Sequence, residues 1–129
     1  MSSSSVELTR AFEAGEIEPG AFRHLDHVVV AFEMLRKYDF IDASLLYGRG
    51  IRALAERAGA PGKFNMTITM AFLSLIAERM GNRDHATCKA FLVANKDLLS
   101  MDALTSRYSS ERLRSDLARE IFLMPDIAA

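Results

Sequence analysis

The sequence predicts an all-α fold, a compact single-domain bundle of six or seven helices around a buried central helix at about residues 64–80. Apolar residues recur every three to four positions along most of the chain, which is the helical period. Gly, Pro, Ser and Asp separate these runs, and no alternating run of strand-forming residues is long enough for a β-strand. The chain has 129 residues, 50% of them hydrophobic, and is therefore of single-domain size.

The N-terminal part predicts a short tail followed by two helices. We expect residues 1–5 to form a polar tail, and residues 6–126 to form one helical domain whose first helix is capped by the last serines of the tail. Pro19 suits the first turn of the second helix, because the N–H that proline lacks would have no helical partner there. The apolar run that follows from Phe22 predicts a helix ending near Tyr38.

The third and fourth helices are the best defined. Asp39 is a suitable N-cap for the third, and Gly59 and Pro61 stop it. Its expected inward stripe is Ala43, Leu46, Ile51, Leu54 and Ala58. Nearly every position from Lys63 to Met80 is apolar or small, and a helix that is apolar all round is buried.

The C-terminal third predicts shorter helices. Asp84 can start a helix that buries Phe91, and residues 100–102 can start another. Ser109 is a suitable cap for the last helix, and Pro125 marks its end. The expected inward residues of this last helix are Leu113, Leu117, Ile121 and Phe122.

The charge and cysteine content of the chain limit which binding partners and which cellular location are expected. Lys and Arg total 16 against 17 Asp and Glu, so the net charge of −1 gives no general attraction to nucleic acid or to an anionic membrane. Cys88 is the single cysteine, and we expect it to be a spectator rather than a nucleophile. No signal-peptide pattern opens the sequence and no apolar stretch is long enough to span a bilayer, which predicts a cytoplasmic protein.

His24 and His27 are the clearest candidate site residues. Side chains three residues apart lie on one helical face, so these two imidazoles can bind one ligand together. Zinc sites use three or four protein ligands, and the third histidine, His85, lies far along the chain. A divalent transition metal at His24 and His27 is therefore compatible with the spacing but not favoured. The alternative is that both histidines are ordinary surface or hydrogen-bonded residues.

Asn65 and Thr69 interrupt the apolar central helix on one face, since they are four residues apart. If this helix packs against the second, His24, His27, Asn65 and Thr69 line a cavity for a small polar molecule. A histidine there would be available for proton transfer near neutral pH, so catalysis stays open although no catalytic residue is assigned. In the alternative, Thr69 bonds to its own helix and Asn65 only caps it.

Two further features bear on function. Gly48 and Gly50 flank Arg49 inside a helical pattern, which excludes a phosphate-binding loop and favours close approach of a neighbouring helix. The apolar helices, rich in Met and Phe, suggest a second hypothesis, a non-enzymatic helical interaction module that forms a homodimer.

Three segments resemble a family of small helical bacterial proteins of uncharacterised function. They are the F-x-H-x-x-H motif at residues 22–27, the K-[YF]-[HN]-x-T-x-T motif at residues 63–69, and a C-terminal segment; the likeness spans about residues 20–126. The C-terminal matches are Tyr108 to Leu113, Ser115, Ala118, Arg119, Pro125 and Asp126. The resemblance implies a helical fold and a third histidine and a carboxylate near the histidine pair. Asn65 and Met66 stand at those two positions here, and the resemblance implies no reaction.

Overall fold

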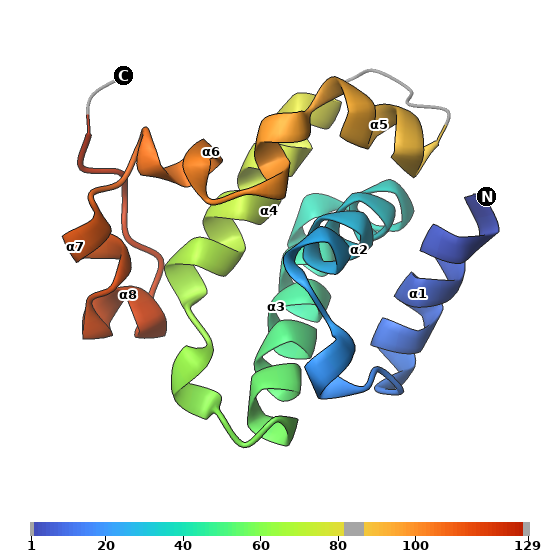
Figure 1. Ribbon diagram of the computed structural model, residues 1–129, viewed down its shortest axis with the longest axis horizontal. Coiled ribbons are helices and arrows are strands. Elements are labelled where there is room, and N and C mark those ends of the chain that lie inside the picture. The colour runs from blue at the N-terminus through green and yellow to red at the C-terminus, as the bar shows by residue number, and fades with distance from the viewer. Residues whose placement is uncertain (1, 82–86, 128–129) are drawn as a thin grey trace.

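The computed structural model describes residues 2–81 and 87–127, and within these ranges it contains eight α-helices and no strand. The all-α prediction is confirmed (Figure 1). The α-helices are α1 (Ser2–Ala14), α2 (His24–Lys37), α3 (Phe40–Arg57), α4 (Met66–Met80), α5 (Cys88–Ala94), α6 (Asp102–Thr105), α7 (Ser110–Leu113) and α8 (Asp116–Glu120). The 3-10 turns are η1 (Pro19–Ala21), η2 (Pro61–Lys63) and η3 (Lys96–Leu99). No described helix has the length and apolarity needed to cross a membrane.

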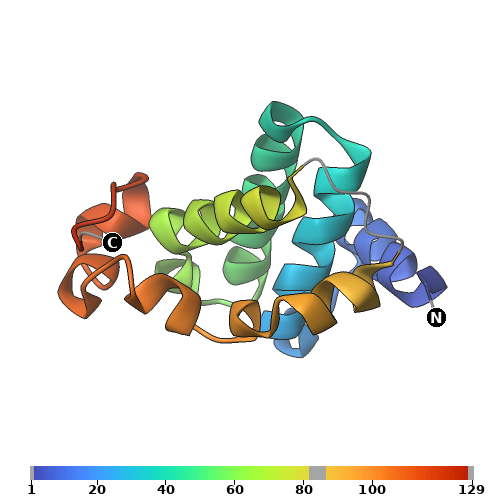
Figure 2. The same cartoon turned by 90° about the horizontal axis from the view of Figure 1, so that it is seen from above.

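The central helix α4 contacts α2, α3 and α8, which agrees with the buried central helix that the sequence predicts. Figures 1 and 2 show α4 running between the group formed by α1, α2 and α3 and the C-terminal helices α6 to α8. The core between these elements is apolar and includes Phe32 and Met34 of α2, Leu73 and Ile76 of α4, and Phe91 of α5. Burial of these side chains is the main stabilising contribution, at about 1.5–3 kcal/mol for each large residue.

Local capping explains where α3 and α4 begin and end. The Asp39 carboxylate accepts the backbone N–H of Asp42 at 2.8 Å, and Asn65 caps α4 in the same way. Gly81 ends α4 with a φ of +51°, a conformation that favours glycine. The cap at Asp39 confirms the predicted start of the third helix, and the cap at Asn65 is the one that the structural alternative predicts.

The N-terminal elements differ from expectation in two respects. Helix α1 begins at Ser2, so the serines expected as a tail and cap belong to the helix, and the Ser5 hydroxyl donates to Glu33 of α2 at 2.6 Å. Pro19 opens a separate 3-10 turn instead of α2. The backbone is extended at Phe22 and Arg23, and α2 therefore starts only at His24.

The last predicted helix is broken in two. Ser115 adopts an extended conformation, and its hydroxyl caps α8 by accepting the N–H of Ala118 at 3.1 Å. Leu117, Ile121 and Phe122 are consequently exposed, whereas the sequence pattern predicts them inward. The expected helix start at Asp84 lies outside the described residues, and α5 is described from Cys88, with Thr87 as its cap.

Helix α3 packs closely on its neighbours through its two glycines. A Cβ added to Gly50 would lie 2.3 Å from Cζ of Phe12, and one added to Gly48 would lie 2.9 Å from Cε of Met70. The close approach expected from these small residues is therefore confirmed. The predicted stripe is wrong at Leu46 and Ala58, which are exposed, while Tyr47 is buried instead because it faces α2.

Candidate functional site

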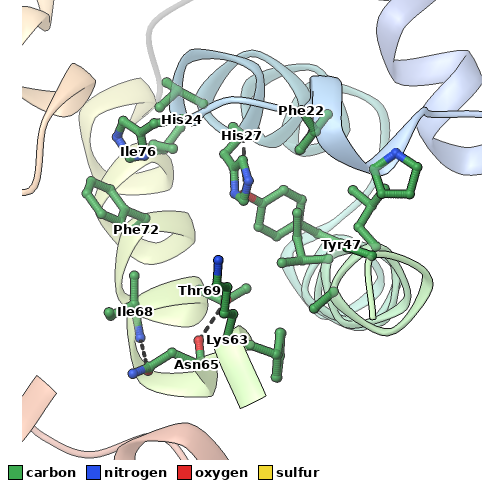
Figure 3. A pocket seen from close by; sticks show the side chains of 17 residues that line it. Phe22, His24, His27, Tyr47, Lys63, Asn65, Ile68, Thr69, Phe72 and Ile76 are labelled. Carbon is green, nitrogen blue, oxygen red and sulfur yellow. Dashed lines mark hydrogen bonds between the residues drawn. The ribbon is translucent and has the colours of Figure 1, made fainter. Parts of the chain in front are cut away.

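A cavity of about 330 Å³ lies between α2, α3 and α4, and all four candidate residues from the sequence line it (Figure 3). This volume is at the lower end of the range of about 300–1,000 Å³ that is typical of ligand pockets. Its walls are mainly apolar and include Phe22, Val28, Ile51, Leu54, Phe64, Ile68, Phe72 and Ile76. Its polar lining residues are His24, His27, Tyr47, Lys63, Asn65 and Thr69.

The starts of two helices bring the candidate residues together. Helix α2 begins at His24, so His24 and His27 both lie in its first turn. Helix α4 begins directly after its cap Asn65, and Thr69 lies one turn further along. Because α2 and α4 pack against each other, two pairs of polar residues with local spacing meet at one cavity.

His24 is held in place by a hydrogen bond outside its own helix. Its Nε2 lies 2.9 Å from the backbone oxygen of Leu98 in η3. A carbonyl oxygen can only accept, so Nε2 carries a proton, and in the neutral ring Nδ1 is the acceptor. The ring meets Phe72 edge-on with centroids 5.0 Å apart. His24 therefore lies fixed at the side of the cavity, next to Phe72 and Ile76 (Figure 3).

His27 projects from α2 into the cavity, and no hydrogen bond joins its ring to another described residue (Figure 3). The ring packs against Phe22, with centroids 4.7 Å apart, and its centroid is 6.3 Å from that of His24. Burial lowers the pKa of His27 to about 4; the charge of His24 lowers it further and Asp26 partly opposes the shift. At neutral pH the ring is therefore uncharged and carries one unpaired donor and one unpaired acceptor.

The sequence predicts a histidine that can exchange a proton near neutral pH. The lowered pKa of His27 does not fit this prediction for that residue. The shift has a simple cause, because an imidazolium in this half-buried, mainly apolar position loses hydration without gaining a partner. The chemistry that His27 offers at neutral pH is hydrogen bonding by a neutral imidazole.

Asn65 and Thr69 bond as the structural alternative predicts, although both also line the cavity. Oδ1 of Asn65 accepts the N–H of Ile68 at 2.9 Å, and Nδ2 donates to the backbone oxygen of Leu113 at 2.7 Å. The Thr69 hydroxyl donates to the backbone oxygen of Asn65 at 2.7 Å. The hydroxyl oxygen of Thr69 retains lone pairs that can accept a further hydrogen bond.

Sequence reasoning missed two polar residues of the cavity. Tyr47 is buried, its hydroxyl donates to the backbone oxygen of His27 at 3.2 Å, and burial raises its pKa. The side chain of Lys63 reaches in from η2 with its amine directed toward the His27 ring (Figure 3). Lys63 begins the second motif of the family resemblance, and this was the signal available for it.

The described residues at the cavity fall short of the ligand set of a typical metal site. Among them, His24 and His27 are the two histidines that line the cavity, and Nε2 of His24 is already bonded to Leu98. Within residues 2–81 and 87–127 no group of three or more His, Cys, Asp or Glu side chains could hold a metal ion. His85 lies outside the described residues. Two imidazoles fall short of the three or four protein ligands of typical zinc sites.

Cys88 lies away from this cavity and is buried at the start of α5. Burial raises the pKa of its thiol to about 11, with a smaller contribution from Glu33. The thiolate is the reactive form of cysteine, so Cys88 has the character of a packed side chain.

Comparison of the chain with protein-family models, with curated proteins and with solved structures finds no match. The resemblance of residues 22–27 and 63–69 to a family of small helical bacterial proteins thus stays a prediction.

Proposed function

We propose that this protein is a cytoplasmic binding protein for a small polar molecule, which occupies the cavity between α2, α3 and α4. The observation that carries the proposal is the imidazole of His27, which projects into a cavity of ligand size and has no hydrogen-bond partner among the described residues. An unpaired polar group costs about 1–3 kcal/mol when it is fully buried, and the cost is smaller for the half-buried ring of His27. A ligand that bonds to this ring therefore recovers free energy that the ligand-free protein lacks.

The other lining residues have distinct roles in this proposal. The neutral His27 ring donates and accepts hydrogen bonds, and the Thr69 hydroxyl supplies a second acceptor. His24 bonds to Leu98 and thereby holds the start of α2 in position. Asn65 bonds to Ile68 and Leu113 and does the same for the start of α4. The proposal is one of binding and assigns no reaction, since a histidine with a pKa of about 4 is a weak base.

Thermal unfolding in the presence of small amides, alcohols and carboxylic acids tests the proposal. A ligand that binds the native state at 100 times its Kd stabilises it by about 2.7 kcal/mol. We expect stabilisation by at least one of these compounds. The variant Ala55→Leu, which fills the cavity from α3, should abolish it. Ala53→Leu on the same helix, which does not line this cavity, should retain it. Absence of stabilisation, or equal stabilisation of both variants, would contradict the proposal.

A second candidate function is that of an interaction module, favoured by the exposed start of α3. Four large apolar side chains are exposed there, and Ile41 is 78% exposed; they are Phe40, Ile41, Leu45 and Leu46. Figure 2 shows this end of α3 projecting beyond the neighbouring helices. Several exposed large apolar side chains near one helix end favour a contact surface between proteins.

Light scattering over a wide concentration range tests the homodimer version of this function. We expect a dimer at high concentration, and we expect Ile41→Glu to shift the protein to monomer because it puts a charge into the apolar contact. A particle that stays monomeric at every concentration would remove the homodimer. Pocket and interface do not exclude each other, because Ile41 does not line the cavity.

A further inference from the structure

Lys63 is the only lining residue of the cavity with a permanent charge, as far as the described residues go. Its amine is directed into the cavity (Figure 3), and neither an ion pair nor a side-chain hydrogen bond joins it to another described residue. Among the residues that the structure describes, no Asp or Glu side chain lines the cavity. Lys63 is exposed to solvent as a whole, and the described lining offers its amine no carboxylate partner, which favours an anionic occupant on grounds of charge complementarity.

The helix ends around the cavity favour the same sign of charge. The N-terminus of a helix carries a partial positive charge, and α2 and α4 both begin at the cavity. The first turn of α4 contains no acidic residue that would neutralise this charge. The first turn of α2 contains Asp26, but Asp26 accepts the N–H of Arg23 and does not line the cavity.

Helix α3 also ends near the cavity, with the opposite partial charge. Its last carbonyl groups are already bonded: the N–H groups of residues 58–60 donate to the backbone oxygens of Leu54, Glu56 and Ala55. Asn65 caps the start of α4 in a comparable way, so the two helix ends partly offset each other and Lys63 supplies the full charge at the described part of the cavity lining.

The remaining walls limit the size and chemistry of the anion. Phe22, Phe72 and aliphatic side chains form most of the surface, and the volume is about 330 Å³. A phosphate group has a larger charge and is typically bound by several donors or an arginine fork. One lysine and one neutral imidazole suit the single charge of a carboxylate better.

We propose, on the basis of the binding function inferred above, that the occupant is a small monocarboxylate with an apolar body. Its carboxylate pairs with the ammonium group of Lys63 and accepts the N–H of the neutral His27 ring. Its apolar body lies against Phe22, Ile68 and Phe72. Lys63 thereby determines the preference for an acid over a neutral analogue, while the walls determine its shape.

A calorimetric titration with benzoate and with benzamide tests this inference, because the two probes have nearly the same shape and differ in charge. We expect benzoate to bind the wild-type protein at least about tenfold more tightly, which corresponds to about 1.4 kcal/mol. Lys63→Met should remove this preference, so that benzoate and benzamide bind the variant with similar affinity. Lys89→Met on α5, away from the cavity, is the matched control and should behave as wild type. Raising the salt concentration should weaken the binding of benzoate alone.

The possible failures separate this inference from the binding function itself. If benzamide binds as tightly as benzoate, or if Lys63→Met keeps the preference, the carboxylate inference is overturned while binding in the cavity stands. A third result is that neither probe binds, while a neutral compound stabilises the wild-type protein and not Ala55→Leu. This result would also overturn the carboxylate inference and leave binding in the cavity intact. If no compound binds at all, both proposals are overturned.

Discussion

Thr67 and His27 are both polar residues near the buried central helix, and the structure treats them in opposite ways. Thr67 is 0% exposed on α4, and its hydroxyl donates to the backbone oxygen of Ile121 at 2.7 Å and accepts the N–H of Leu123 at 3.0 Å. His27 lines the cavity between α2, α3 and α4, and its ring has no hydrogen-bond partner among the described residues.

The two residues illustrate the difference between a polar side chain that stabilises the fold and one that is available to a ligand. A buried polar group that is fully hydrogen-bonded holds segments together, and Thr67 ties the C-terminal segment to α4 in this way. A polar group left unpaired beside a cavity destabilises the ligand-free fold and is explained better by binding. The three predictions below test this distinction, beginning with the largest expected effect.

Thr67→Val should lower the free energy of unfolding by about 2–4 kcal/mol. Valine has nearly the same shape as threonine, so the loss comes from the unpaired backbone oxygen of Ile121 and the unpaired N–H of Leu123. Urea unfolding followed by circular dichroism measures this effect.

Thr69→Val is the matched control, because it removes a hydroxyl from the same helix. The backbone oxygen of Asn65 still accepts the N–H of Thr69 at 3.0 Å after this change, so the expected cost is below about 1 kcal/mol. Equal losses for Thr67→Val and Thr69→Val would show that the two hydroxyl groups are not distinguished by their partners.

The two sides of α4 also differ in how well the sequence predicts them. Two features depend only on neighbours in sequence, and the pattern shows them directly: the caps Asp39 and Asn65, and the i, i+3 spacing of His24 and His27. The prediction that the two histidines share a cavity with Asn65 and Thr69 needed one assumption about tertiary packing, namely that α2 packs on α4. The structure confirms this packing.

The missed features depend on contacts between residues far apart in the chain. The break of the last helix at Ser115 accompanies the bonds from Thr67 to Ile121 and Leu123, more than fifty residues away in sequence. The bond from His24 to Leu98 and the direction of Lys63 toward His27 likewise depend on packing. No periodicity in the sequence could have revealed them.

The free energy of unfolding should fall by roughly 2–3 kcal/mol between about pH 6.5 and pH 4 because of His27. The folded-state pKa of about 4 lies below the ordinary value of 6.5, so between these values the unfolded chain binds a proton that the native state does not. The native state is therefore favoured less as the pH falls, and above about pH 6.5 His27 contributes no further change.

Urea unfolding at a series of pH values measures this dependence, with His27→Phe as the reference. Other groups titrate in the same range, so the relevant quantity is the difference between the pH profiles of the two proteins. Parallel profiles would mean that His27 titrates at its ordinary pKa and that its ring is well solvated.

His27→Phe and His24→Phe should have opposite effects at neutral pH, each of about 1 kcal/mol. Phenylalanine at position 27 keeps the contact with the Phe22 ring and removes an unpaired imidazole, so we expect stabilisation together with loss of ligand binding. Phenylalanine at position 24 leaves the backbone oxygen of Leu98 without its partner, so we expect destabilisation. Urea unfolding of both variants measures the pair of effects. Destabilisation by His27→Phe as large as that by His24→Phe would mean that both rings serve the fold, and the contrast between Thr67 and His27 would lose its functional meaning.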